Sequence, residues 1–185
     1  MRLVSTTKDL ALAGGFGALL FAIDAVFTPL QSITNIPGIV GVVDTFFWVI
    51  VATIAILITR KLGFFTITAA IYGLMSVPMI TWGGPGFHKL LMIMPVAAVV
   101  EAILLLTNYS ALGINIAIAT GLPVAYIMQL YVMAQLGISG AETYMKFLVP
   151  FLIAAMVEGF IGGAIGIWLY NKKIKNLKVV KAIQA

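Results

Sequence analysis

Long apolar stretches recur along the whole chain and are separated by short polar or glycine-rich segments. A helix needs about 20 apolar residues to cross a hydrocarbon core that is roughly 30 Å thick. Six stretches meet this requirement, so the pattern predicts an all-α membrane protein built as a bundle of six transmembrane helices. The predicted spans are Leu10–Leu30, Val43–Thr59, Phe64–Trp82, Leu90–Thr107, Ala111–Gln135 and Phe147–Tyr170.

The composition indicates the same class of protein. Of the 185 residues, 62% are hydrophobic and only 9% are charged, whereas soluble domains carry roughly 25% charged residues. So few charges leave most of the folded surface facing lipid, which excludes a soluble enzyme, a nucleic-acid-binding domain and a disordered chain. We therefore expect one integral membrane domain over residues 1–185, with several spans in a prokaryotic cell membrane.

The basic residues predict the orientation. If both termini are cytoplasmic, nine Lys and Arg residues lie on the inner side and only Lys89 and Lys146 lie on the outer side. Cytoplasmic loops carry an excess of Lys and Arg, so this distribution favours cytoplasmic termini and an even number of spans. The basic tail, residues 171–185, is expected to be a short helix or a frayed end that contacts anionic lipid.

Three carboxylates fall inside the predicted spans, at Asp24, Glu101 and Glu158. Charged groups at this depth are costly and are functional candidates by default. At about 1.5 Å of rise per residue, Glu158 is expected near the midplane, Glu101 towards the inner face and Asp24 towards the outer face. Asp44 is expected at the start of a helix, where the helix dipole favours a carboxylate.

Polar and aromatic residues at the outer ends of the spans predict a binding pocket near the outer face. Tyr126 and Gln129 are three residues apart and share one face of the fifth span. A buried Gln needs a hydrogen-bond partner, which is either another helix or a ligand. Aromatic residues here either stack on a ligand or belong to the interfacial belt. The predicted pocket residues are Trp82, His88, Tyr126, Gln129, Tyr144 and Glu158.

No motif for catalysis, nucleotide binding or metal binding occurs in the sequence. His88 is the only histidine and has no second ligand near it, and the chain has no cysteine. An intramembrane aspartyl protease would need Asp24 and Asp44 brought together, and their positions in the predicted spans are poor for that. We therefore expect no enzymatic activity, no metal and no cofactor.

Small residues at four-residue spacing predict close helix packing. Gly14, Ala18 and Ala22 form such a stripe on the first span, which we interpret as a docking surface for another membrane subunit. The sixth span carries two glycine pairs, Gly159 with Gly163 and Gly162 with Gly166. For these pairs, packing within the bundle is the favoured interpretation.

With these features the chain resembles a substrate-binding S-component of an energy-coupling factor (ECF) type ABC transporter. The resemblance rests on six spans in a short chain, the stripe Gly14–Ala18–Ala22, the glycine-rich segment 158–166 and the following Asn171-Lys172-Lys173. It implies a vitamin pocket near the outer face, lined by the first, third and fifth loops and by helices four to six. It also implies a coupling transmembrane subunit and two ATPase subunits as partners, beside the small-molecule ligand and membrane lipid, and no nucleic acid.

The substrate and two other functions stay open. The Met-His start expected of cobalt and nickel S-components is absent, which puts a metal-ion substrate in doubt. The intramembrane acids favour a cationic ligand, with thiamine or its pyrimidine precursor as the first candidate. One alternative is a small proton- or sodium-coupled permease that uses Glu101 and Glu158 as a relay. The other is a non-transporting subunit of a membrane complex.

Overall fold

The computed structural model describes residues 3–33, 37–79, 85–137, 145–146 and 148–184, and within them the chain is helical. The described part has no strand beyond a single bridge between Leu3 and Leu62. The all-α prediction is therefore confirmed. The helices are α1 (Thr7–Ile33), α2 (Pro37–Thr59), α3 (Phe64–Ser76), α4 (His88–Leu106), α5 (Ala111–Gln135), α7 (Leu148–Leu169), the π-helical turn η1 (Tyr170–Ile174) and α8 (Lys178–Gln184).

Five of the described helices, α1, α2, α4, α5 and α7, are long and apolar enough to cross a membrane. Their length and composition are those of a membrane protein. The remaining apolar helix, α3, has only 13 residues. At about 1.5 Å per residue it is about 20 Å long, which is less than the thickness of the hydrocarbon core.

The third predicted span differs most from the structure. It was expected to continue to Trp82, but the helix ends at Ser76 and turns follow as far as Met79. Pro78 explains the end, because its ring clashes with the preceding turn and it has no N–H to donate. The N–H of Val77, the residue before Pro78, donates to Leu74 O three residues back, so the last turn of the helix is tighter than an α-helical turn. Trp82 itself lies outside the described residues.

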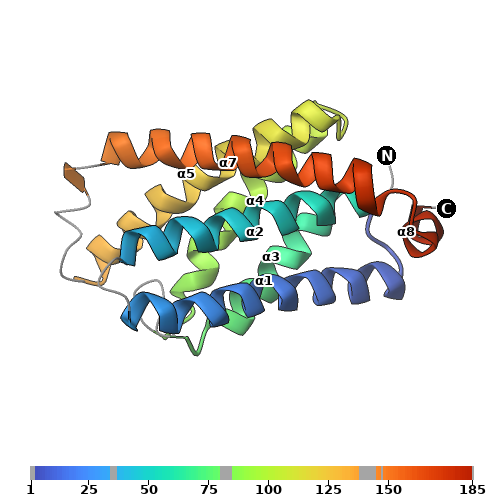
Figure 1. The fold of residues 1–185 in the computed structure, drawn as a ribbon. Helices are drawn as coiled ribbons and strands as arrows, with labels where there is room; N and C mark the ends of the chain where they lie inside the picture. Colours follow the sequence, from blue (N-terminus) through green and yellow to red (C-terminus); the bar gives the residue numbers. More distant parts are fainter. Residues whose placement is uncertain (1–2, 34–36, 80–84, 138–144, 147, 185) are drawn as a thin grey trace.

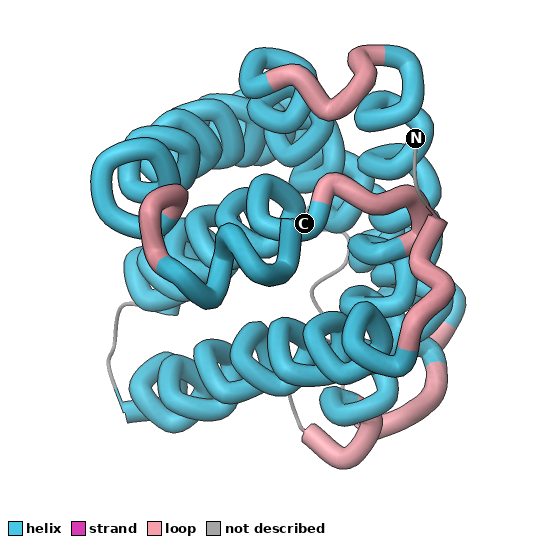
Figure 2. Tube along the Cα trace, turned by 90° about the vertical axis from the view of Figure 1, so that its right-hand side faces the viewer, coloured by secondary structure: helices cyan, strands magenta, loops and turns pink. Residues whose placement is uncertain are grey.

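The helices form two layers. Figure 1 shows α1, α2 and α7 side by side in front, with α3, α4 and α5 behind them. The layers are joined where α1 packs on α3 and where α7 packs on α5. Both termini lie at one end of the bundle (Figure 1), and Figure 2 looks onto that end, with α8 lying across it.

The glycines of α7 bring that helix close to both of its neighbours. A Cβ atom on Gly159 would lie 2.7 Å from Ala119 Cα on α5, and one on Gly166 would lie 2.8 Å from Thr53 Cβ on α2. A Cβ atom on Gly163 would lie closer still to Asn115 Oδ1 on α5, and one on Gly162 would lie 2.7 Å from Val49 Cγ1 on α2. Packing within the bundle, the favoured interpretation of these glycine pairs, is confirmed.

Glu101 has a structural role at the end of the bundle that carries the termini. Its Oε1 accepts from the backbone N–H groups of Phe65, at 3.0 Å, and Thr66, at 3.3 Å, in the first turn of α3. Its Oε2 accepts from the Tyr109 hydroxyl at 3.1 Å. Burial, and then the neighbouring Glu101, raise the pKa of Tyr109 above its usual value. A carboxylate at a helix N-terminus satisfies amides that lack helical partners, so the burial of Glu101 needs no ligand to explain it.

Candidate functional site

Buried polar side chains from three helices meet in the half of the bundle away from the termini. Asp24 on α1 and Tyr72 on α3 are 2% and 6% exposed, and the Tyr72 hydroxyl donates a hydrogen bond to Asp24 Oδ2. Asp44 on α2 is 8% exposed. The carboxyl groups of Asp24 and Asp44 approach closely enough to share a hydrogen bond.

Two expectations about the aspartates are wrong. Asp44 does not lie at the start of its helix, because α2 already begins at Pro37 and Asp44 lies in its interior. The two aspartates also do meet, although their predicted positions were judged poor for this. The reason is that α1 and α2 pack side by side and both carry their aspartate on the buried face. The absence of a catalytic motif from the sequence remains the argument against an aspartyl protease.

Lys89 on α4 lies beside this pair and is buried. It is 4% exposed, and its Nζ donates to the carbonyl oxygens of Ser76 and Met79 at 2.6 Å each. These carbonyls belong to the end of α3 and the turn after it, so the ammonium satisfies acceptors that have no helical donor. The charge of Lys89 also interacts with that of Asp24.

Glu158 adds a third acid from α7. Its carboxyl group lies close enough to Asp44 for the two charges to interact. Glu158 Oε1 and Asp44 Oδ1 are both buried and have no hydrogen-bond partner among the described residues. We call Asp24, Asp44 and Glu158, together with Tyr72 and Lys89, the acid cluster.

The acid cluster carries more negative than positive charge. Three ionised carboxylates and one ammonium sum to a net charge of −2, and this charge would sit in an apolar interior. Two neighbouring carboxylates cannot both stay ionised there without a counter-charge, so the cluster must take up protons or a cation. The unpartnered oxygens of Asp44 and Glu158 are the hydrogen-bond acceptors available to such a proton or cation.

A small cavity adjoins the acid cluster. Its volume is about 40 Å³, and it is lined by Tyr72, Ser76, Lys89, Met92 and Ala125 among others. This is room for a few water molecules, since one water needs roughly 10–15 Å³ measured in the same way. Pockets for drug-sized ligands measure about 300–1,000 Å³. A vitamin-sized ligand would therefore fit here only if the surrounding helices moved apart.

An aromatic residue that the sequence analysis did not select lies against the cluster. Trp48 on α2 is 8% exposed and packs edge-to-face on Tyr72, with ring centroids 5.9 Å apart. Trp48 also packs edge-to-face on Phe65, with ring centroids 6.2 Å apart. The spacing of four residues between Asp44 and Trp48 was the available signal, because it places both on one face of α2.

The six predicted pocket residues are placed as follows. Trp82 and Tyr144 lie outside the described residues. His88 is partly buried at the first position of α4, and Tyr126 and Gln129 are partly buried on α5. Neither these three nor Glu158 line the 40 Å³ cavity. Glu158 lies within range of the charge of Asp44 instead, so the described polar centre lies nearer to α1, α2 and α3 than was predicted.

The predicted docking stripe on α1 is divided between two faces. A Cβ atom on Gly14 would lie 4.0 Å from Ile71 of α3, so Gly14 faces the bundle. Ala18 is half-buried and Ala22 is exposed. Ala11 and Gly15 are exposed as well, so the small residues on the open face of α1 are Ala11, Gly15, Ala18 and Ala22.

Comparison with known proteins gives no match, whether the chain is set against family models, curated proteins or solved structures.

Proposed function

We propose that this chain is the substrate-capture subunit of an ECF-type importer and that it binds a small cationic micronutrient. The observation that carries the proposal is the acid cluster, in which three carboxyl groups outnumber one ammonium inside a membrane bundle. An organic cation with N–H donors would supply the missing positive charge and hydrogen bonds to the free oxygens of Asp44 and Glu158. Thiamine or its pyrimidine precursor is the first candidate.

The aromatic surroundings support an organic cation over a simple ion. A cation gains about 0.5–2 kcal/mol over the face of a Trp or Tyr ring, and more when it is desolvated. Trp48 and Tyr72 supply such rings beside the carboxylates. Among the described residues, no three His, Asp or Glu side chains lie close enough together to hold a metal ion.

In this proposal both termini are cytoplasmic and the chain crosses the membrane six times, with α3 in the third crossing. The chain is no enzyme and needs no cofactor. A coupling transmembrane subunit and two ATPase subunits supply the energy, and the open face of α1 docks on the coupling subunit. Small side chains allow this close approach of two helices in lipid.

Calorimetry on the isolated protein in neutral detergent tests ligand capture. We expect thiamine to bind without any partner, and neutral vitamins of similar size to bind at least tenfold more weakly, a difference of about 1.4 kcal/mol. The titration is repeated at two salt concentrations. Because salt screens buried charge pairs only weakly, the affinity for thiamine should change little between them. Equal affinity for neutral and cationic vitamins, or no binding to any, contradicts the proposal.

Copurification tests the docking face. Replacing both Ala18 and Ala22 by Trp should abolish complex formation with the coupling subunit, because two large rings prevent close helix contact. Thiamine binding should persist in the isolated variant. The matched control is Ile161→Trp, an exposed position on α7 that should leave the complex intact. A doubly substituted protein that still copurifies with its partner overturns the docking assignment.

The second candidate is a proton-coupled permease, and the contact between Asp24 and Asp44 favours it. Two carboxyl groups in one hydrogen bond share a proton, which suits a relay. Glu101, which the sequence suggested as part of the relay, accepts hydrogen bonds from the first turn of α3 and lies away from this pair. Proteoliposomes that hold this chain alone distinguish the two functions, since only the permease would transport solute without ATPase subunits.

A further inference from the structure

A second cavity lies at the end of the bundle that carries both termini, opposite the acid cluster. Its volume is about 300 Å³, which reaches the range of ligand-binding pockets. The residues that line it and carry the argument below are Arg60, Lys61, Tyr170, Lys175 and Gln184. We call it the basic cavity.

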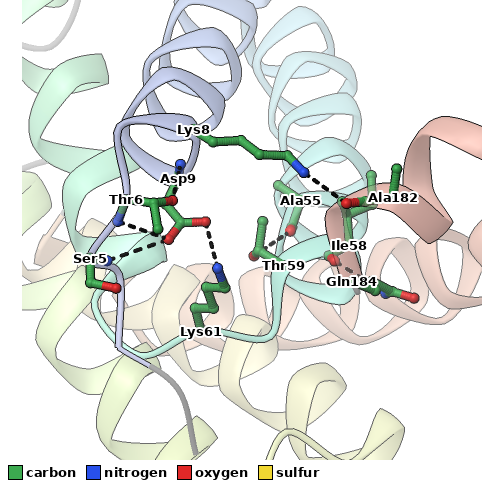
Figure 3. Close-up of polar contacts among 10 residues, drawn as sticks. All are labelled: Ser5, Thr6, Lys8, Asp9, Ala55, Ile58, Thr59, Lys61, Ala182 and Gln184. Atoms are coloured by element: carbon green, nitrogen blue, oxygen red, sulfur yellow. Dashed lines mark hydrogen bonds and ion pairs between the residues drawn. The ribbon is translucent and has the colours of Figure 1, made fainter.

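The docked C-terminal helix forms one wall of this cavity. Gln184 Nε2 lies 3.1 Å from both Leu57 O and Ile58 O at the end of α2, and 2.8 Å from the Tyr170 hydroxyl oxygen. On the other side of α8, Lys8 Nζ donates to Ala182 O at 2.7 Å (Figure 3). The tail is thus a helix fixed to the bundle, and its position gives the cavity a defined wall.

The basic side chains around the cavity differ in whether they pair with an acidic residue. Lys61 Nζ is paired with Asp9 Oδ1 at 2.6 Å (Figure 3), so its charge is already compensated. Arg60 and Lys175 form no salt bridge with any described residue. Two positive charges therefore face the same 300 Å³ space without a counter-charge from the described part of the chain.

Tyr170 supplies a third donor. Its hydroxyl oxygen accepts the bond from Gln184, which leaves its own hydrogen for an acceptor. The side chain is 3% exposed, so an acceptor for this hydrogen would have to enter the cavity. A guanidinium, an ammonium and a hydroxyl donor together match the oxygens of a phosphate group.

The backbone at Arg60 is a further sign that the side chain is needed there. Arg60 has φ 46°, the left-handed conformation in which helices commonly end. Glycine adopts it without cost, whereas other residues do so at some expense of stability. Arginine stands at this position, directly after α2 and beside the cavity.

We propose that the basic cavity binds a phosphate group, either free phosphate or the phosphodiester headgroup of an anionic phospholipid. Basic pockets at the cytoplasmic ends of membrane helices are suited to such headgroups. Arg60 provides the two-pronged contact, Lys175 the second charge and the Tyr170 hydroxyl a neutral hydrogen bond. The bound phosphate would link the ends of α2 and η1 to α8, because Arg60 directly follows α2, Lys175 directly follows η1 and Gln184 lies on α8.

Native mass spectrometry and thermal unfolding in neutral detergent test this site. The probes are phosphatidylglycerol, phosphatidylcholine of the same chain length, and sodium phosphate against sodium chloride at equal ionic strength. We expect at least tenfold tighter binding of phosphatidylglycerol than of phosphatidylcholine. The double variant Arg60→Gln, Lys175→Gln should lose that preference, and the control Lys172→Gln, Lys173→Gln should keep it. The control removes the same charge from exposed positions on η1 that do not line the cavity.

The arms separate the two sources of phosphate. Stabilisation by sodium phosphate alone, and competition of it with the lipid, supports a site for free phosphate. A preference for the lipid that sodium phosphate does not reduce supports a headgroup site. Equal loss of binding in both double variants reduces the effect to diffuse attraction by a basic surface and overturns the proposal, as does the absence of any anion preference.

A second variant tests Arg60 in a protein that is expected to fold normally. Arg60→Gly removes the side chain while relaxing the left-handed backbone, so the protein should be at least as stable as the parent in neutral detergent. It should nevertheless bind phosphatidylglycerol about tenfold more weakly. Undiminished binding in this folded variant overturns the assignment of Arg60.

Discussion

Replacing Gly159 by Ala should destabilise the protein by about 1–3 kcal/mol, although alanine is the better helix former by about 1 kcal/mol. A Cβ atom there would lie 2.7 Å from Ala119 Cα and 3.3 Å from Ala119 N. Both of these atoms belong to the backbone of α5, so no side-chain rotation can relieve the clash. α7 must move away from α5, and the contacts along both helices are lost with it.

Thermal unfolding in detergent, followed by circular dichroism, measures this effect. The matched control is Gly15→Ala on α1, where an added Cβ meets nothing within 4 Å. The control should be unchanged or slightly stabilised, because only the gain in helix propensity remains. If the two variants unfolded at the same temperature, close packing of α7 on α5 would not be a main source of stability.

Replacing Asp24 by Asn should weaken thiamine binding by more than tenfold, or about 1.4 kcal/mol, while leaving the fold intact. The amide oxygen still accepts from the Tyr72 hydroxyl, so that buried donor keeps a partner. The negative charge is lost, and with it the attraction for a cation. Repulsion between Asp24 and Asp44 is relieved as well, so the free energy of unfolding should stay equal or rise.

Two further variants make this result specific. Glu158→Gln removes a second charge of the acid cluster and should also weaken thiamine binding by more than tenfold. Glu101→Gln removes a buried charge at the other end of the bundle, where the carboxylate caps α3, and should lower stability without changing affinity. Unchanged affinity in Asp24→Asn and Glu158→Gln, with both proteins folded, would leave the acid cluster as an internal polar network and remove the reason for a cationic ligand.

The helices were largely predictable because long apolar runs have few alternatives in a chain this hydrophobic. Ala111–Gln135 was predicted with the bounds that the structure shows. Ser110 before it accepts a hydrogen bond from Gly113 N, a helix start that the sequence signals directly. The predicted third span runs past Pro78, and membrane helices can tolerate an internal proline, whereas α3 ends before it.

The centre of the site was harder to predict than the helices. The sequence marks Asp24 and Glu158 as unusual residues, but it does not give the rotation of each helix about its axis. That rotation decides that Asp24 meets Asp44 and that Lys89 turns inward to the carbonyls of Ser76 and Met79. The predicted pocket relied on residues at helix ends and loops, where Trp82 and Tyr144 lie outside the described residues.

The short α3 has a consequence for how the chain enters the bilayer during synthesis. A 13-residue apolar helix is too short to be held in the membrane on its own. Ser76 O accepts from Met79 N within the turn, whereas Met79 O, in the turn after α3, accepts from Lys89 at the start of α4, and a carbonyl without a donor is costly in hydrocarbon. α3 and α4 should therefore leave the translocation channel together, as a preformed hairpin, and not one after the other.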